Sequence, residues 1–366
     1  MTADTVGGVW TYALELAGAL TEADVEVHLA TMGRLPSAAQ RDEAAAVAGL
    51  VLHESAHRLE WMDDPWDDVA RAGEWLLSLE SRLAPEVVHL NGYAHAALRF
   101  AAPTVVVAHS CVCSWWRAVH GEEAPASWDA YRRAVRAGLE RADAVVAPSA
   151  AMLAALEEHH GVRVRRGRVI PNGRDAARHP PREKERLVLG AGRLWDEAKN
   201  VGTLARAARS LAWPVLLAGD DAPPDGAPAD APGARMLGVL PQREMAEWMG
   251  RAAVFAHPAR YEPFGLAPLE AALAGCALVL GDIPSLREVW GAAPRWVAPD
   301  DAAALARTLD ALMRDDTARG AVAARCRRRA LRYTPQRMVA GYVRLYETLL
   351  AERGAASTPE PEASCA

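Results

Sequence analysis

The sequence predicts an α/β protein with two parallel-sheet domains that face each other across a cleft. Three observations predict it. Short apolar runs of strand character alternate with Ala-, Leu- and Arg-rich stretches of helical period, which is typical of parallel sheets. The alternation pauses in the polar, proline-containing stretch 175–186 and then starts again. A chain of 366 residues is also long enough for two cores.

The first half predicts a Rossmann-like domain over residues 1–174. A glycine pair, Gly7-Gly8, opens an amphipathic helix near the start, and such a turn lets backbone N–H groups approach a phosphate or sugar. Only six residues precede the pair, so a truncated first strand is one interpretation of the start. The other candidate strands are the apolar runs 25–32, 87–92, 104–110, 144–149 and 168–173.

The second half predicts a linker at 175–186 and a second Rossmann-like domain over 187–333. The stretch 334–352 is predicted to be a final helix, and the Ala-, Pro- and Glu-rich segment 353–366 a disordered tail. The candidate strands of this domain are 187–193, 215–221, 236–241, 253–258 and 277–282.

The composition excludes several classes of protein. The net charge of −6 argues against a nucleic-acid partner. No apolar run approaches the ~20 residues of a membrane-spanning helix, and the start lacks the order of a signal peptide, so we expect a cytoplasmic location. Docking on a membrane through a local patch stays open. The five cysteines are odd in number and scattered, and we interpret them as reduced thiols.

The stretch EPFGLAPLE, residues 262–270, has the most specific pattern. Two carboxylates, Glu262 and Glu270, flank a Pro-Phe-Gly turn. A helix after the turn explains Glu270, because the positive end of the helix dipole stabilises a carboxylate in the first turn. It does not explain Glu262. Ligands bind beyond the carboxyl ends of parallel strands, where this turn is expected to lie. The pattern therefore predicts a ligand site.

Two cations follow the first strand of the second domain, in the stretch GAGRLWDEAKN. Arg193 and Lys199 stand at a strand end and helix start, which suits a diphosphate whose charge they would neutralise as it leaves. The chain has only two lysines, Lys184 and Lys199, and one of them falls here. The alternative interpretation is a pair of solvated cations.

Metal-binding patterns are weaker. HESAH, residues 53–57, matches the H-E-x-x-H pattern of zinc proteases, which requires both histidines one turn apart on a helix. It follows a strand-like run instead, so we expect no metal. His109 ends an apolar strand, where it is either a buried structural residue or a contact for a substrate hydroxyl. Cys111 and Cys113 add only a C-x-C pattern with one histidine.

Taken together, these segments resemble family 4 of the retaining GT-B glycosyltransferases, which have two Rossmann-like domains. The strongest point of likeness is EPFGLAPLE, which matches the E-x7-E motif of the family. The resemblance implies a metal-independent hexosyltransferase that uses a UDP-, GDP- or ADP-sugar, no cofactor, and a small-molecule or glycan acceptor. It also implies that the final helix packs back on the N-terminal, acceptor-side domain. The other matching stretches are 7–10, 108–110, 141–152, 169–175 and 190–200.

The resemblance also implies roles for individual residues. Arg193 and Lys199 would grip the donor diphosphate, and Glu270 would bind the ribose hydroxyls. Glu262 would hold the donor sugar, and His109 would contact that sugar near the reacting carbon. Transfer would then proceed on the front side of the sugar with retention, with the departing diphosphate assisting deprotonation of the acceptor.

Further implied contacts involve backbone groups. Gly8 would line the acceptor-side face of the cleft near the diphosphate. The turn after Glu262 would offer its amides to the donor sugar, and the loop near residue 239 would lie beside the base. The residues that the resemblance implies for these two segments are Phe264, Gly265, Leu266, Gly238 and Leu240.

Three alternatives remain at this point. A disaccharide synthase or phosphorylase of similar architecture would use the same domains, and a non-catalytic protein that binds nucleotide-sugars would use the same cleft. A zinc peptidase built on HESAH is the third. The segment HESAHRLEWMDDPWDD, residues 53–68, matches no general pattern of this family. One interpretation is that it helps to define the acceptor.

Overall fold

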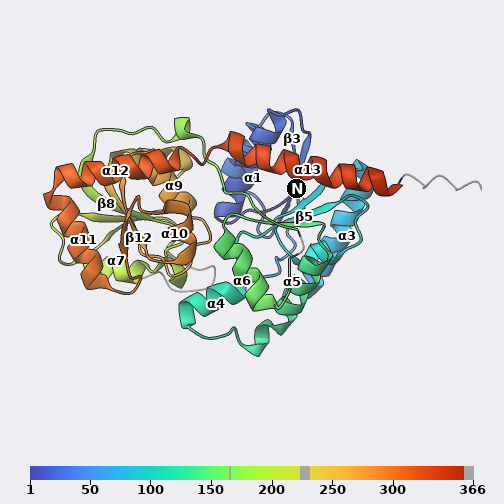
Figure 1. Cartoon of the computed structure of the whole chain (residues 1–366), viewed down its shortest axis with the longest axis horizontal. Coiled ribbons are helices and arrows are strands. Elements are labelled where there is room, and N and C mark those ends of the chain that lie inside the picture. The colour runs from blue at the N-terminus through green and yellow to red at the C-terminus, as the bar shows by residue number, and fades with distance from the viewer. Residues whose placement is uncertain (165, 223–230, 358–366) are drawn as a thin grey trace, which may run out of the picture.

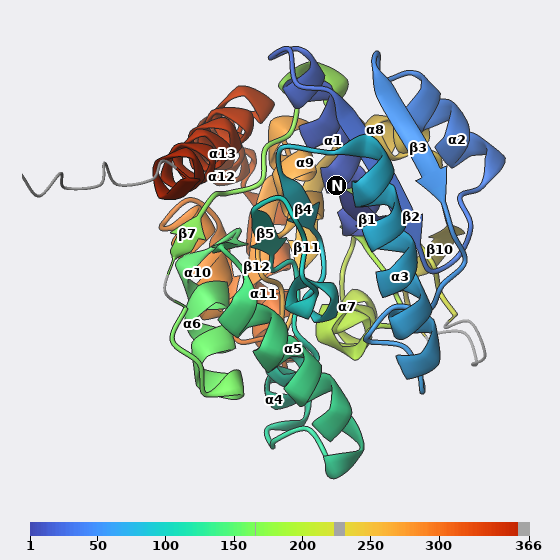
Figure 2. The same cartoon turned by 90° about the vertical axis from the view of Figure 1, so that its right-hand side faces the viewer.

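The computed structural model describes residues 1–164, 166–222 and 231–357. It has two α/β domains side by side, and the long C-terminal helix α13 (Pro335–Ser357) crosses from the second domain to the first (Figure 1). Each domain is built on parallel strands with helices packed against them (Figure 2). The predicted fold class is therefore confirmed.

All strand pairs of the N-terminal domain are parallel, in two ladders of order β1-β2-β3 and β4-β5-β6-β7. Asn91 joins the ladders, because its backbone N–H donates to Thr2 Oγ1 at 2.9 Å and its side-chain amide donates to Thr2 O at 2.7 Å. The strands are β1 (Thr2–Asp4), β2 (Val27–Met32), β3 (Leu50–Glu54), β4 (Val88–Leu90), β5 (Thr104–Val107), β6 (Ala144–Ala147) and β7 (Gly167–Val169).

The helices of this domain connect the parallel strands. The first of them, α1, starts at Gly8 and buries one face, including Tyr12 and Leu16, in the core. The helices are α1 (Gly8–Thr21), α2 (Ala38–Ala45), α3 (Trp66–Leu83), α4 (Val112–His120), α5 (Asp129–Arg141) and α6 (Ala150–His160), with 3₁₀ turns η1 (Ala94–Ala97) and η2 (Ala126–Trp128).

The C-terminal domain has one parallel sheet of order β10-β9-β8-β11-β12-β13. Its central strands are buried, which explains why they read as continuous apolar runs rather than alternating ones. The strand order reverses at β8, so ligands are expected beyond the carboxyl ends of β8 and β11. The strands are β8 (Glu185–Ala191), β9 (Val215–Ala218), β10 (Arg235–Gly238), β11 (Ala252–His257), β12 (Ala277–Gly281) and β13 (Arg295–Val297).

Helices cover this sheet and lead to the last crossing of the chain. They are α7 (Val201–Ala208), α8 (Gln242–Arg251), α9 (Leu266–Leu273), α10 (Pro284–Trp290), α11 (Ala302–Arg314) and α12 (Asp316–Ala330), with 3₁₀ turns η3 (Ala176–Arg178) and η4 (Glu197–Lys199). Helix α13 then packs against α1, and four of its side chains belong to the N-terminal core: Met338, Tyr342, Leu345 and Leu349.

Two predicted boundaries differ from the structure. Helix α13 continues to Ser357, so the tail predicted from 353 is wrong for residues 353–357, whose backbone remains helical. The rest of the predicted tail, 358–366, lies outside the described residues. Strand β8 begins at Glu185, inside the predicted linker, because pairing with β11 already starts there. At the start of the chain, β1 is a three-residue strand paired with β2.

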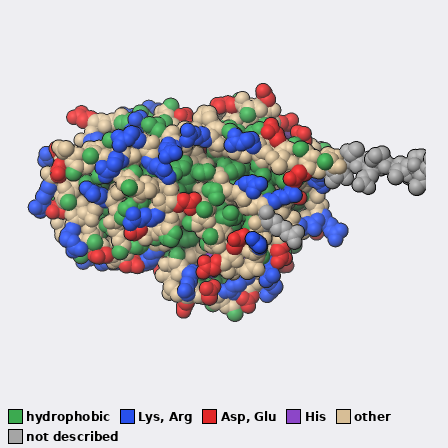
Figure 3. Space-filling model, in the orientation of Figure 1, with side chains coloured by type: hydrophobic (Ala, Val, Ile, Leu, Met, Phe, Trp, Pro, Cys, Tyr) green, Lys and Arg blue, Asp and Glu red, His purple; other side chains and the backbone are tan. Residues whose placement is uncertain are grey.

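No helix within the described ranges is long and apolar enough to cross a membrane. On the face shown in Figure 3, acidic and basic side chains are mixed around a group of hydrophobic side chains in the middle of the molecule. That face therefore carries no large field of one sign.

Candidate active site

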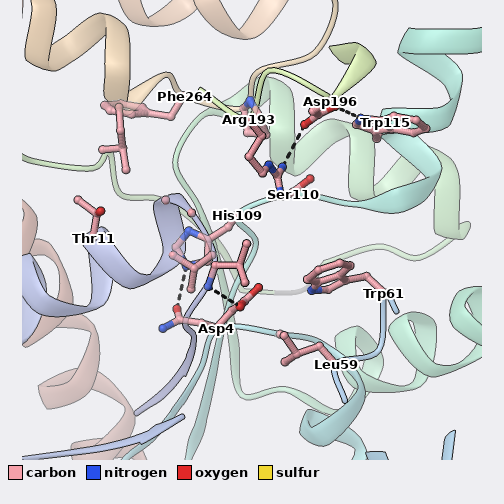
Figure 4. Close-up of a pocket in the computed structure, with 18 of the residues that line it drawn as sticks. Asp4, Thr11, Leu59, Trp61, His109, Ser110, Trp115, Arg193, Asp196 and Phe264 are labelled. Carbon is pink, nitrogen blue, oxygen red and sulfur yellow. Dashed lines mark hydrogen bonds and ion pairs between the residues drawn. The ribbon is translucent and has the colours of Figure 1, made fainter. Parts of the chain in front are cut away.

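A cleft of about 1050 Å³ lies between the two domains. Strand ends and the loops after them line it from both sides, as expected for paired parallel sheets. Figure 4 shows residues from the N-terminal domain, such as Asp4 and His109, facing the same space as Arg193 and Phe264 of the C-terminal domain. Among the predicted site residues, Gly8, His109, Arg193, Lys199, Glu262, Phe264, Gly265, Leu266 and Glu270 line this cleft.

The turn after β11 presents Glu262 and starts α9. Gly265 has φ 93°, a left-handed conformation that glycine adopts without strain. A Cβ at this position would also lie 3.2 Å from Pro268 Cγ. Ser285 Oγ donates to the Glu262 carbonyl at 2.6 Å and holds the turn from the side of α10. The Pro-Phe-Gly sequence thus directs Glu262 into the cleft and points the start of α9 the same way.

Glu262 is the anion of a partly buried ionic cluster. Lys199 Nζ lies 2.7 Å from Glu262 Oε2, and His257 Nε2 lies 3.3 Å from the same oxygen. Burial alone would raise the pKa of Glu262, but the Lys199 ammonium and His257 outweigh it and hold that pKa well below its usual range. The structure therefore brings two predicted residues together and adds a third, His257, which the sequence analysis missed.

Arg193 stands beside this cluster and is held by a contact between the domains. Its Nη2 lies 3.1 Å from Asp196 Oδ2, and its guanidinium lies 5.4 Å from the centre of the Trp195 ring. Asp196 Oδ1 accepts a hydrogen bond from Trp115 Nε1, on α4 of the other domain, at 2.9 Å (Figure 4). Arg193 remains 38% exposed, so its donors are available to a ligand in the cleft.

Glu270 forms an ion pair with Arg174, the residue just before the predicted linker. Arg174 Nε lies 2.8 Å from Glu270 Oε1, and Arg174 Nη1 lies 2.6 Å from Glu15 Oε2 on α1. Arg174 is only 4% exposed, and Asp175 N donates to Glu15 Oε1 at 2.9 Å. Arg174, a buried arginine just before the predicted linker, thus connects α1 of the N-terminal domain with the second carboxylate of the motif.

His109 is oriented by a hydrogen-bonded chain that ends on α13. Its Nε2 lies 2.8 Å from Asn91 Oδ1, and the same oxygen lies 3.2 Å from His89 Nε2. His89 Nδ1 lies 2.6 Å from the Tyr346 hydroxyl. The Asn91 amide nitrogen donates to Thr2 O, which turns its oxygen toward both imidazoles. Because an amide oxygen only accepts, His109 carries its proton on Nε2.

Burial lowers the pKa of His109 to about 3. The imidazole is therefore neutral at physiological pH, and with Nε2 donating to Asn91, its Nδ1 is an acceptor. A neutral acceptor suits a substrate hydroxyl better than it suits a phosphate.

The base-side loop differs in detail from the implied contacts. Val239 lines the cleft and is 74% exposed. Gly238 and Leu240, the two residues named from the sequence, flank it without lining the cleft themselves. Gly238 has φ 71°, which turns the chain after β10.

Asp4 is a cleft-lining carboxyl group that the sequence analysis missed. It ends β1, and its Oδ1 accepts a hydrogen bond from Val6 N at 2.7 Å. Burial raises the pKa of Asp4 to about 6, although that hydrogen bond and the positive charges of Arg193 and Arg34 act in the opposite direction. The available signal was an aspartate at the end of the first strand, just before the glycine pair.

The raised pKa of Asp4 predicts a pH-dependent stability difference. The pKa of Asp4 in the folded protein, about 6, exceeds the ordinary 3.8. Protonated Asp4 therefore contributes fully to the stability of the folded state below about pH 4, and this contribution is lost as the pH rises through 6. Asp4→Asn should be more stable than the parent at about pH 8, and the difference should shrink near pH 4. Thermal unfolding of both proteins at the two pH values tests this, and a difference independent of pH would contradict it.

HESAH does not form a helical metal site. His53 lies in strand β3, and His57 in the loop that follows, so the two cannot stand one helical turn apart. His53 Nε2 instead lies 3.0 Å from His28 Nδ1 of the neighbouring strand, and the rings stack. The zinc peptidase alternative therefore lacks its geometry.

His53→Ala should consequently leave the activity and the ligand affinity of the cleft within about twofold of the parent. The side chain lies on β3 and does not line the cleft. Activity measured with and without a chelator, beside the same measurement on His53→Ala, checks this. If the parent lost activity on addition of the chelator and His53→Ala were inactive as well, a metal site at HESAH would be supported again.

A different cluster of metal-ligating side chains lies in the N-terminal core. Cys111, Cys113 and His160 offer ligand atoms within 4.8 Å of one another, and all three are buried. Cys111 Sγ lies 3.1 Å from His160 Nε2, so the histidine beside the C-x-C pair is His160, not His109. Structural zinc sites take four ligands, and the group found in the described part of the chain has three. The contact between Cys111 and His160 is explained by a buried hydrogen bond.

Comparison with known proteins agrees with the division into two domains. Residues 6–178 match the family model "Glycosyltransferase Family 4", and residues 185–315 match "Glycosyl transferases group 1". The glycogen synthase of Mycobacterium tuberculosis is 31% identical over 266 residues, which cover 64% of this chain and 61% of that protein. The phosphatidyl-myo-inositol mannosyltransferase of Mycolicibacterium smegmatis is 33% identical over 199 residues, which cover 49% and 51%. The match thus spans about three fifths or less of these relatives.

Solved structures share the fold over nearly the whole chain. A sucrose-phosphate synthase from Thermosynechococcus elongatus has a TM-score of 0.79 at 18% identity and covers 96% of each chain. Anabaena HepE, solved in complex with UDP-glucose, has a TM-score of 0.70 at 16% identity, covering 97% of this chain and 100% of that one. At these identities the likeness is one of fold.

Proposed function

Because the chain belongs to the GT4-type glycosyltransferases of GT-B fold, we propose that it transfers a hexose from a nucleotide-diphosphate sugar to a hydroxyl group. The acceptor is a small molecule or a glycan, the configuration at the sugar is retained, and no metal takes part.

One observation carries this proposal. Lys199 and Glu262, from two different loops of the C-terminal domain, meet at 2.7 Å in the cleft, with Arg193 on the same side. A diphosphate needs cations, and a sugar needs a carboxylate for its hydroxyls, so this cluster presents both chemistries side by side. The start of α9 adds backbone N–H groups beside it.

In the proposed reaction, Arg193 and Lys199 hold the diphosphate and offset the charge that develops as it leaves. The bond from the anomeric carbon to the diphosphate oxygen breaks, the acceptor oxygen forms the new bond on the same face, and the acceptor proton leaves with the diphosphate. No protein nucleophile is required. Glu262 is paired with Lys199 and His257, which suits a role in binding. Neutral His109 can accept a hydrogen bond from a sugar hydroxyl.

The identity of the base and sugar is the next question. The structure of HepE holds UDP-glucose, which makes UDP the first nucleotide to try on this chain. GDP and ADP remain in the comparison, because Val239, the residue of this loop that lines the cleft, has an apolar side chain with no group that would select one base.

Calorimetric titration with UDP, GDP and ADP and their sugar conjugates, in buffer with a chelator, tests the proposal. We expect one diphosphate to bind the parent and to bind Lys199→Ala at least tenfold more weakly. Transfer or slow donor hydrolysis is then followed with the matching sugar conjugate. Binding without turnover would favour the non-catalytic alternative, and no binding by folded protein would overturn the proposal.

A further inference from the structure

The cleft has a second half that the proposed donor contacts leave unused. Asp4 at the end of β1, and Leu59 and Trp61 from the loop before α3, line it on the side of the N-terminal domain. Figure 4 shows the Asp4 carboxyl group and the Trp61 indole directed into the same part of the cavity, with His109 and Arg193 beyond them. This half is therefore open to a second substrate next to the donor site.

The loop that carries Trp61 is anchored rather than loose. Its neighbour Glu60 is buried, and the Glu60 carboxylate accepts hydrogen bonds from Tyr93 N at 2.9 Å and Ala94 N at 2.6 Å. These donors lie at the start of η1, so the carboxylate caps that turn. Glu60 thus fixes Trp61 at the edge of the cleft.

The exposure of these side chains is unusual for their types. Trp61 is 37% exposed although it is a large apolar side chain, and it lines a cleft rather than an outer surface. Asp4 is 9% exposed, and the hydrogen bond that it receives comes from Val6 N to one oxygen, Oδ1. An exposed aromatic plane beside a mostly buried carboxylate is costly unless a ligand covers the first and donates to the second.

We propose that Asp4 and Trp61 form the acceptor subsite and that the acceptor presents an uncharged saccharide ring. The apolar face of the ring stacks on the Trp61 indole, and its hydroxyls donate to Asp4. This inference rests on the proposed function and names the substrate class of the same cleft.

Charge and shape favour this class over two others. The Asp4 carboxyl group disfavours a phosphorylated acceptor because like charges repel, although the exposed Arg34, in the turn after β2, offers such a group a partner. A lipid chain has no hydroxyl group to donate to the Asp4 carboxylate, so it would cover that carboxylate without giving it a hydrogen bond. A saccharide satisfies both the aromatic plane and the carboxylate.

The test uses Trp61→Ala, Trp61→Phe and Asp4→Asn in the full chain, with Asp24→Asn as the matched control. Asp24 is an exposed aspartate with φ 58°, which asparagine tolerates. Transfer is measured to a panel of uncharged mono- and disaccharides, a hexose phosphate and an alkyl glycoside. Donor affinity is measured separately by calorimetry with the nucleotide that binds the parent.

We expect Trp61→Ala to raise the acceptor KM at least tenfold while the donor Kd stays within twofold, and Trp61→Phe to restore most of the loss. Asp4→Asn should lower kcat/KM for saccharides without changing the donor Kd, and Asp24→Asn should match the parent. An unchanged acceptor KM in Trp61→Ala would overturn the proposal. Preference for the hexose phosphate that disappears in Arg34→Ala would overturn the assigned class.

Ligand-observed NMR with the same saccharides gives a readout that does not depend on transfer. Saccharide signals that respond to the parent and not to Trp61→Ala would support the subsite even if no nucleotide binds. Equal responses from both proteins would overturn it. Failure of the donor titration and failure of this experiment are thus separate results.

Discussion

Lys199→Ala is expected to lower turnover by about 10²–10³-fold, the usual effect of removing one group that stabilises developing charge. The ammonium would contact the departing diphosphate, and it also neutralises Glu262 at 2.7 Å. Its removal leaves that carboxylate with His257 alone, so its pKa should rise. Steady-state kinetics and the diphosphate titration measure both effects.

The only other lysine supplies the matched control. Lys184 Nζ donates to Ala274 O at 2.7 Å and to Met249 O at 3.2 Å, within the C-terminal domain and away from the cleft. Lys184→Met should lose thermal stability and keep the diphosphate affinity, whereas Lys199→Ala should lose the affinity. The assignment of Lys199 to the diphosphate fails if both variants bind the nucleotide equally well.

Arg174→Met is expected to reduce the free energy of unfolding by about 3–5 kcal/mol, the typical cost of removing one partner from a buried ionic group. Glu15 and Glu270 would both lose their cation, and Glu15 is only 5% exposed. Urea unfolding of the two proteins, followed by far-UV circular dichroism, measures the loss. We also expect weaker nucleotide binding, because Glu270 would lose its orientation.

Two further variants separate the ionic effect from a general loss of packing. Adding Glu15→Gln to Arg174→Met removes one stranded carboxylate and should recover part of the stability. Arg41→Met breaks an ion pair with Glu54 at the surface, where solvent screens the charges, and should change stability little. Equal losses of unfolding free energy in Arg174→Met and Arg41→Met would mean that burial does not increase the contribution of the ion pair to stability.

Much of the fold was predictable because its signals are local. Apolar runs and helical periods reflect neighbouring residues, and the break near the linker appears as a change in composition. The Glu262 turn was predictable for the same reason, since all of its parts lie within nine residues, 262–270. The end of α13 was not, because an Ala-rich segment such as GAA is compatible with both a helix and a tail.

The partners within the site were harder to predict. Arg174 and Glu15 are 159 residues apart in sequence, and nothing in either segment indicates that they meet. Asp4 lies in a strand of only three residues, too short for a periodic pattern. For HESAH, the letters matched a helical motif, but pairing with β2 placed His53 in a strand, and tertiary context overrode the local pattern.

Helix α13 has a consequence for biosynthesis. Met338, Tyr342, Leu345 and Leu349 complete a core whose other buried side chains come from the first 170 residues. The N-terminal domain therefore stays unfinished until α13 has emerged from the ribosome, whereas all the described strands of the C-terminal sheet precede α13 in the chain. Until then the side of α1 that packs against α13 is open to solvent, and a nascent chain with such an exposed apolar surface is prone to aggregation and to chaperone binding.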